Sequence, residues 1–131
     1  MSYLLDTTHV IDLLHDDPAV VQLLDTLSPN GVATSIITYL EAFQGTLRLQ
    51  RPIPQATLET LFDYLPVLPL TPAIAQRCAR LREHLKRQGK QPNRRAFDLI
   101  IAATALEHGL TLVTSNQQDF SDLPGLTLYQ P

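Results

Sequence analysis

The 131-residue sequence predicts an α/β fold, namely one three-layer α/β/α domain with a central, mostly parallel sheet of four to five short strands. Two observations favour this class. Short runs of apolar and β-branched residues alternate with longer segments of helical periodicity, which is typical of parallel strands joined by helical crossovers. In addition, no internal repeat or long linker divides the chain, so residues 1–131 are expected to form a single domain.

The first half of the chain carries two predicted strands, each followed by helix. Asp17 and Pro18 form an N-cap and first-turn pair, and Gly31 ends that helix. Thr38 is the N-cap candidate for the next helix, and Thr38-Tyr39-Leu40-Glu41 matches a capping box, in which Glu41 would only return a hydrogen bond to the backbone. The predicted elements are a strand at 3–5, helices at 10–14 and 18–27, a strand at 32–37, and helices at 38–49 and 54–64.

Prolines and glycines mark the element boundaries in the second half. Pro66 ends one helix, Thr71 and Pro72 open a long one, and Gly109 closes an apolar helix as its C-cap. The predicted elements are a strand at 67–70, a helix at 72–86, a polar connection at 88–95, a helix at 96–108, a strand at 110–114, a short turn or helix at 116–120, and a last strand at 126–129.

Charge is distributed unevenly along the chain. The net charge is −3, yet eight of the ten Lys and Arg residues lie between positions 77 and 95. Residues 1–47 and 96–131 contain no Lys or Arg. The protein is therefore an acidic body with one basic segment. Such a segment is typical either of a solvated helix face or of a surface that contacts nucleic-acid phosphates.

The composition excludes several classes of protein. With 44% hydrophobic and 18% charged residues, the chain is too apolar to be disordered. No apolar run reaches the roughly 18 to 20 residues that span a bilayer, and the N-terminus lacks a basic signal region. The single cysteine, Cys78, allows no internal disulfide, and its apolar neighbours predict a packed, inert thiol. An intracellular, cytoplasmic protein without membrane contact is expected.

Acidic and amide side chains follow several of the predicted strands. In an open parallel sheet, ligands bind beyond the carboxyl ends of the strands. The crossovers after the strands at 3–5, 32–37 and 110–114 bring polar groups to this edge, and one further acid lies near the start of the apolar helix at 96–108. These candidates are Asp6, Glu41, Asn116, Asp119 and Asp98.

Each acid also has a purely structural interpretation. Asp6 can cap the following helix, Glu41 can complete the capping box, and Asp119 can be a solvated turn residue. Asp98 is harder to explain in this way, because it is flanked by Phe97 and Leu99 and no Lys or Arg follows it in the helix. A buried carboxylate without a partner is costly.

Several carboxylates in one crevice require a positive charge. At an effective dielectric constant of about 20, each close pair repels by a few kcal/mol. Oxygen ligands without Cys or paired His suit Mg²⁺ or Mn²⁺ rather than zinc. Ions of this kind often bind substrate phosphates, so the pattern points to metal-assisted phosphoryl chemistry, although it does not separate a metal ligand from a general base.

Four segments resemble the PIN-domain ribonucleases, in particular the VapC toxins of type II toxin–antitoxin pairs. These segments are YLLDTTHVIDLL (3–14), ATSIITYLEAFQG (33–45), FDLIIAATALEHGLTLVTSNQQDF (97–120) and PGLTL (124–128). They occur in the family's order and at its spacing over nearly the whole chain. The resemblance implies a PIN-like domain.

The resemblance also assigns roles to individual residues. It implies that Asp6, Glu41 and Asp98 are the catalytic metal ligands. Asn116 stands where many PIN domains have Asp, and Asp119 is the alternative for this fourth acidic position. Thr8 departs from the family's usual Asn. Small hydroxyl residues that line such sites, and that are equally well explained as caps or strand-end hydrogen bonds, are Thr7, Ser35 and Thr114.

The implied function is a Mg²⁺- or Mn²⁺-dependent endoribonuclease that acts as a toxin, with RNA as substrate, a cognate antitoxin as partner and a homodimer as the usual assembly. Candidate phosphate contacts are Arg87, Arg94 and Arg95, with Arg77 and Arg80 expected near the same face. Apolar residues at 38–64 suit either a partner surface or the core. Two alternatives stay open: a metal-dependent enzyme acting on DNA or small phosphoesters, and a noncatalytic RNA-binding or interaction module in which Asn116 reflects a decayed site.

Overall fold

Four short parallel strands form the central sheet in the order β3-β2-β1-β4. In the computed structural model, which describes residues 1–131, Leu4 of β1 lies opposite Ala33 of β2 on one side and Leu112 of β4 on the other. The predicted parallel α/β fold is confirmed. The strands are β1 (Tyr3–Leu5), β2 (Val32–Ser35), β3 (Val67–Leu68) and β4 (Thr111–Val113).

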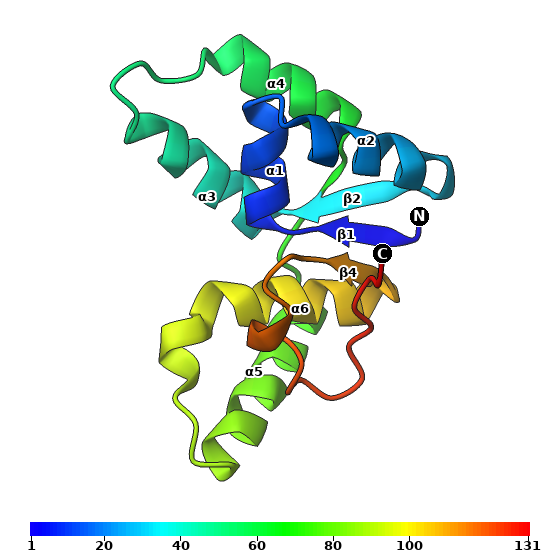
Figure 1. Cartoon of the computed structure of the whole chain (residues 1–131). Coiled ribbons are helices and arrows are strands. Elements are labelled where there is room, and N and C mark those ends of the chain that lie inside the picture. The colour runs from blue at the N-terminus through cyan, green and yellow to red at the C-terminus, as the bar shows by residue number, and fades with distance from the viewer.

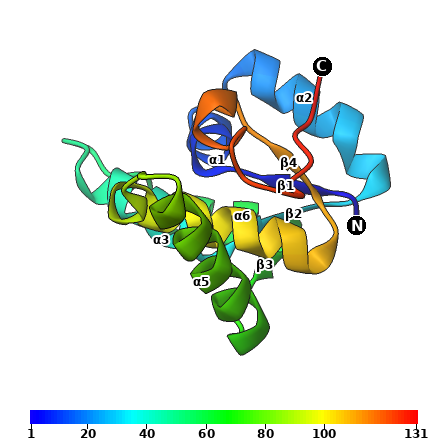
Figure 2. The ribbon, with the colours of Figure 1, turned by 90° about the horizontal axis from the view of Figure 1, so that it is seen from below.

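Six α-helices cover the two faces of this sheet (Figure 1). Helices α1, α2 and α4 lie over one face, and α5 and α6 lie over the other. Figure 2 shows α2 and α5 on opposite sides of the strands. None of these helices is long and apolar enough to cross a membrane. Their bounds are α1 (Thr7–Leu14), α2 (Pro18–Leu27), α3 (Ile36–Leu47), α4 (Gln55–Tyr64), α5 (Pro72–Arg87) and α6 (Ala96–His108).

The period of two along the strands divides the apolar side chains between two cores. Leu4 is fully buried in the core under α5 and α6, whereas its neighbour Leu5 is buried in the core under α1, α2 and α4. Cys78 of α5 is buried in the first of these cores, as predicted for a packed thiol. Both faces of the sheet are therefore covered, which gives the three-layer arrangement.

The strand order places a ligand site at the carboxyl end of β1. From β1 the chain crosses to β2 and β3 on one side and then returns to β4 on the other side of β1. The helices that follow neighbouring strands diverge at such a switch point and leave a crevice. Because α6 runs back along the sheet before β4, its first turn lies at this same edge (Figure 1).

The predicted boundary between β2 and the next helix is wrong. The strand ends at Ser35 rather than Ile37, because Ser35 is the N-cap and its Oγ accepts a hydrogen bond from the backbone N–H of Ile37 at 3.0 Å. Thr38 is instead buried within α3. The capping-box interpretation of Thr38 and Glu41 is therefore wrong, and Glu41 projects from the second turn of α3.

Three other boundaries differ from the sequence prediction. The first helix begins at Thr7, because Asp6 caps it. β3 contains only two residues, since Pro69 has no N–H to donate to the sheet. The predicted strand at 126–129 is reduced to one parallel bridge between Leu128 and Leu112. Within the polar connection at 88–95, Pro92–Arg95 forms a 3-10 turn.

Candidate active site

Asp6 lies directly after β1, is 5% exposed and is held in place by His9. Its Oδ1 accepts a hydrogen bond from the backbone N–H of His9 at 3.1 Å and lies 2.7 Å from the ring Nδ1 of His9. Its Oδ2 has no hydrogen-bond partner in the protein. The capping role predicted as one option is thus confirmed, and it uses one carboxylate oxygen while leaving the other available to a ligand.

His9 is a site residue that sequence reasoning missed. Its hydrogen bond to Asp6 raises the pKa of the imidazole, and this effect outweighs the opposing effect of burial. The available signal was its position three residues after an N-cap Asp, where a side chain on the first turn can reach back to the cap. An imidazole is a strong partner for a buried carboxylate at this distance.

Glu41 is held by Thr7 across the boundary between two helices. Thr7 Oγ1 is 2.7 Å from Glu41 Oε1 and 3.2 Å from Thr38 Oγ1. A hydroxyl has a single proton, so Thr7 donates it to the closer, charged carboxylate and accepts from Thr38. Thr7 therefore fixes Glu41 of α3 against the first turn of α1.

Asp98 lies in the first turn of α6 and makes no ion pair within the protein. Burial raises its pKa, and the charges of Glu41 and Asp119 raise it further, whereas Arg95 lowers it. Asp6 also contributes to the raised pKa. Glu41, Asp119 and Asp6, three acids that the sequence predicts at the sheet edge, thus lie close enough to Asp98 for their charges to raise its pKa.

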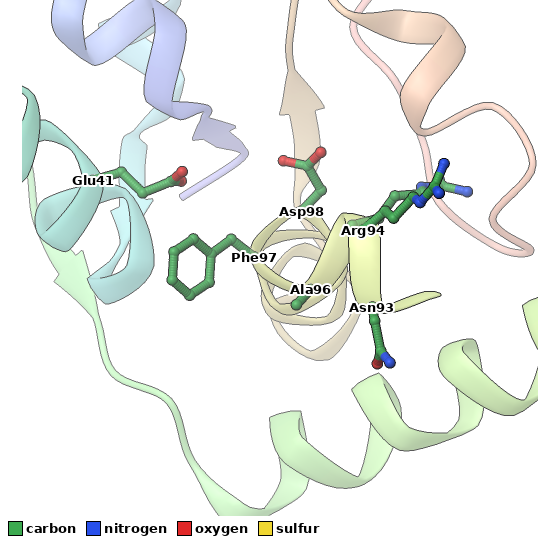
Figure 3. A pocket seen from close by; sticks show the side chains of 7 residues that line it. Glu41, Asn93, Arg94, Ala96, Phe97 and Asp98 are labelled. Atoms are coloured by element: carbon green, nitrogen blue, oxygen red, sulfur yellow. The ribbon is translucent and has the colours of Figure 1, made fainter. Parts of the chain in front are cut away.

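A cavity of about 340 Å³ contains two of these carboxylates (Figure 3). Figure 3 shows Glu41 and Asp98 directed into the same space from α3 and α6. The cavity is lined by Glu41, Asn93, Arg94, Arg95, Ala96, Phe97 and Asp98. Its carboxylate oxygens are hard donors of the kind that divalent cations prefer, and Arg94 and Arg95 add two positive charges to the same lining.

The donor set fits a hydrated divalent ion better than a fully protein-enclosed one. No group of three His, Cys, Asp or Glu side chains is close enough to hold a metal ion directly. Mg²⁺ usually keeps several waters and binds through one or two carboxylates. The residues present therefore fit Mg²⁺ or Mn²⁺ held partly through water.

The two candidates for the fourth acidic position both lie in the segment that follows β4. Asn116 is exposed, and its backbone N–H donates to Thr114 Oγ1 at 3.0 Å. Asp119 is also exposed, yet its charge contributes to the raised pKa of Asp98. Of the small hydroxyl residues, buried Ser35 caps α3 and buried Thr114 accepts this backbone hydrogen bond, so both have structural roles.

Two basic residues of the segment at 77–95, Lys90 and Arg95, pair with Asp122. Arg95 Nη1 and Nη2 each donate to Asp122 at 2.9 Å, and Lys90 Nζ donates to Asp122 at 2.6 Å. These partners, Arg95 first, hold the pKa of Asp122 well below its usual range. Arg95 also donates to the backbone carbonyl of Asp119. Arg95 is therefore part of a structural ion pair at the wall of the cavity.

The other arginines lie in different places. Arg94 is exposed and lines the cavity with Glu41 and Asp98. Arg77 pairs with Glu107 and lines a separate cavity together with Arg80. Exposed Arg87 ends α5. Arg77 and Arg94 line different cavities, and the expectation that the arginines of the segment lie near one phosphate-binding face stays a prediction.

Comparison with known proteins supports the sequence resemblance. The tRNA(fMet)-specific endonuclease VapC of Shigella flexneri is 30% identical over 127 residues, which cover 96% of this chain and 95% of that relative. Ribonuclease VapC5 of Mycobacterium tuberculosis is 38% identical over 111 residues, which cover 79% of this chain and 77% of that relative. Among solved structures, VapBC2 from Rickettsia felis bound to a promoter DNA fragment matches with a TM-score of 0.87 and 26% identity, covering 98% of each chain. The PIN domain model matches residues 3–126, and the chain therefore belongs to the PIN domain family.

Proposed function

We propose that this protein is a divalent-metal-dependent endoribonuclease, using Mg²⁺ or Mn²⁺, and the toxin of a toxin–antitoxin pair. The observation that carries this proposal is the approach of Asp6, Glu41 and Asp98, from three different elements, at the carboxyl edge of the sheet. The relatives named as ribonucleases and the similarity to VapBC complexes support the same function.

Asp6, Glu41 and Asp98 are the residues that would hold the ion. An ion held there would supply water activation and charge stabilisation for hydrolysis of an RNA phosphodiester. The chain itself supplies orientation: His9 holds one oxygen of Asp6, and Thr7 holds one oxygen of Glu41. These hydrogen bonds fix the remaining carboxylate oxygens toward a ligand, as the outer partners of metal ligands usually do.

We infer that Asp119, rather than Asn116, fills the fourth acidic position. The support is electrostatic, because Asp119 contributes to the raised pKa of Asp98. Arg95 holds the segment that carries Asp119 through its hydrogen bonds to Asp122 and to the Asp119 carbonyl. We assign phosphate contact to Arg94 and Arg87, which are exposed and free of ion pairs within the protein.

Cleavage of total cellular RNA tests the proposed activity. Wild-type protein is compared with Asp6→Asn in Mg²⁺, in Mn²⁺ and in EDTA, and Asp63→Asn, which changes an exposed acid on α4, is the matched control. Cleavage should require metal, should be lost in Asp6→Asn and should persist in Asp63→Asn. Undiminished activity in EDTA or in Asp6→Asn contradicts the metal site, and equal cleavage of DNA supports the alternative nuclease. Sequencing of the RNA ends identifies the target.

The proposed assembly includes a cognate antitoxin and a homodimer in the cytoplasm. The support is the similarity of this chain to solved toxin–antitoxin complexes over nearly its full length. Co-expression with the reading frame immediately upstream, followed by light scattering, tests both partners. A complex of the two chains with suppressed RNA cleavage is expected. A monomer with no bound partner and undiminished toxicity would contradict the pairing.

A further inference from the structure

The cavity that holds Glu41 and Asp98 has an exposed aromatic side chain at its edge. Phe97, in the first turn of α6, is 42% exposed and lines the same cavity as the two acids. We propose that Phe97 is a base-binding subsite, a platform on which an unpaired nucleobase next to the cleaved phosphate stacks. The inference deepens the proposed ribonuclease function and depends on it, because it assigns single-stranded RNA as the substrate class.

Phe97 differs from nearly every other aromatic residue of the chain, because it is exposed and has no aromatic partner. Tyr3 packs edge-on against Tyr129, and Tyr39 packs against both Phe43 and Phe62. Phe120 is buried. Only Phe97 and Tyr64 are both exposed and without an aromatic partner. Tyr64 lies at the end of α4 and lines a different cavity, so it provides a matched control.

The surroundings of Phe97 suit a nucleotide. Figure 3 shows the ring on the side of Asp98 that faces Glu41, whereas Arg94 points to the other side of Asp98. An RNA strand with one phosphate at the carboxylates can thus place a base on Phe97 and a second phosphate near Arg94. Every base has a π-face, so aromatic stacking binds single strands with little dependence on sequence. In a duplex these faces are covered by neighbouring bases, so stacking selects unpaired RNA.

A different surface of the chain has the composition that suits an apolar protein segment. A largely apolar cavity of about 500 Å³ runs along α3 from Ile36 to Leu47 and does not include Phe97. The cavity at Phe97 is instead lined mainly by charged and polar side chains. An aromatic ring among groups that bind metal and phosphate fits a nucleobase better than it fits an apolar protein segment.

A single-tryptophan variant measures the stacking directly. The chain contains no Trp, so Phe97→Trp introduces the sole reporter at the subsite, and Tyr64→Trp introduces one at the control position. Both are combined with Asp6→Asn to prevent cleavage and titrated with a single-stranded oligoribonucleotide in Mn²⁺, with binding followed independently by anisotropy of labelled RNA. RNA should quench the fluorescence of Phe97→Trp strongly and that of Tyr64→Trp little. Binding without quenching of Phe97→Trp overturns the proposal.

Kinetics of the cleaving enzyme provide the second test. Phe97→Leu should raise KM for single-stranded RNA by about 5- to 150-fold, equivalent to about 1–3 kcal/mol, with a smaller change in kcat. Phe97→Tyr should restore KM, and the Mn²⁺ affinity of Phe97→Leu should equal that of wild type. An unchanged KM overturns the proposal. An unchanged KM with an altered oligomeric state or antitoxin affinity overturns it in favour of protein docking at Phe97.

The two tests separate this proposal from the ribonuclease function. If the metal-dependent activity is absent, wild-type protein and Asp6→Asn both leave RNA intact, whereas RNA still quenches Phe97→Trp. If only the base subsite is wrong, wild-type protein cleaves RNA in a metal-dependent manner and Phe97→Leu cleaves with the same KM. A failure of the ribonuclease function and a failure of the base subsite therefore give different experimental results.

Discussion

Replacing Asp98 with Asn should stabilise the metal-free protein while removing much of its response to metal. Asp98 is partly buried near Glu41 and Asp119 and makes no ion pair within the protein. Its raised pKa means that the ionised form is less favourable in the folded state than in the unfolded state. Asn has nearly the same shape and no charge, so Asp98→Asn removes the free-energy cost of holding an ionised carboxylate at this position.

Two opposing contributions determine how much stability the metal-free protein gains from Asp98→Asn. One pKa unit corresponds to about 1.4 kcal/mol, and solvent screening reduces this value for a half-exposed group. A carboxylate in the first turn of a helix is itself favoured by about 0.3–1 kcal/mol, and this part is lost on substitution. Burial and the charges of Glu41 and Asp119 raise the pKa of Asp98 and outweigh the lowering effect of Arg95. We expect a net gain of about 1 kcal/mol or less at pH 7.

The stability difference between Asp98→Asn and the wild type depends on pH. Below the unfolded pKa of an Asp side chain, about 3.9, the carboxyl is protonated in both states and Asp98 carries no penalty. The penalty grows as pH rises and is complete above the raised folded pKa. The stability gained in Asp98→Asn should therefore be absent near pH 3 and full at pH 7.

Urea unfolding in EDTA and in Mn²⁺ measures both effects. In EDTA at pH 7, Asp98→Asn should be more stable than wild type, and the Asp63→Asn control should be unchanged. Mn²⁺ at 100 times its Kd should stabilise wild type by about 2.7 kcal/mol and Asp98→Asn by much less. Lower stability of Asp98→Asn in EDTA would contradict the predicted cost of the charged Asp98 side chain. An equal stabilisation of both proteins by Mn²⁺ would contradict its role as a metal ligand.

Three further predictions concern the walls of the site. Asp122→Asn should lower stability at pH 7 by about 1.5–3 kcal/mol, because it breaks the charged hydrogen bonds to Arg95. Since the pKa of Asp122 is lowered in the folded protein, this loss of stability should begin to shrink as pH falls below about 3.9 and should vanish only below the lowered folded pKa. A loss in urea unfolding that is as large at pH 2 as at pH 7 contradicts this prediction. Thr7→Val should weaken Mn²⁺ binding about 10- to 100-fold by releasing Glu41, and calorimetry showing wild-type affinity would count against this role. Arg94→Glu should weaken RNA binding and lower its salt slope by about one or more, whereas an unchanged slope removes Arg94 from the interface.

Much of the fold and of the acidic edge follows from the sequence, because both depend on periodicity and chain order. Parallel strands joined by helices must bring their carboxyl ends to one edge, so Asp6 and Glu41 converge whatever the details of packing. The acid before β4 is predictable for the same reason, since the helix that carries it must run back along the sheet.

The sequence predictions fail where two neighbouring residues could both cap the same helix, or where a side chain contacts a residue that is distant in the sequence. Ser35 and Thr38 both have side chains that suit an N-cap, and in the structure Ser35 caps α3 whereas Thr38 is buried within it. The pairing of Arg95 with Asp122 joins residues 27 apart, so no local pattern reveals that this arginine has a structural partner. His9 escaped notice because its role depends on the geometry of the cap at Asp6.

The proposed function requires that the carboxylates of Asp6, Glu41 and Asp98, which come from three parts of the fold, bind a common divalent ion. Calorimetric titration with Mn²⁺ of the wild type and of Asp6→Asn, Glu41→Gln and Asp98→Asn tests this most directly. We expect saturable binding by the folded wild-type protein and at least about tenfold weaker binding in each variant. Absence of Mn²⁺ binding by the wild type, or wild-type affinity in any one of the three folded variants, would contradict the claim.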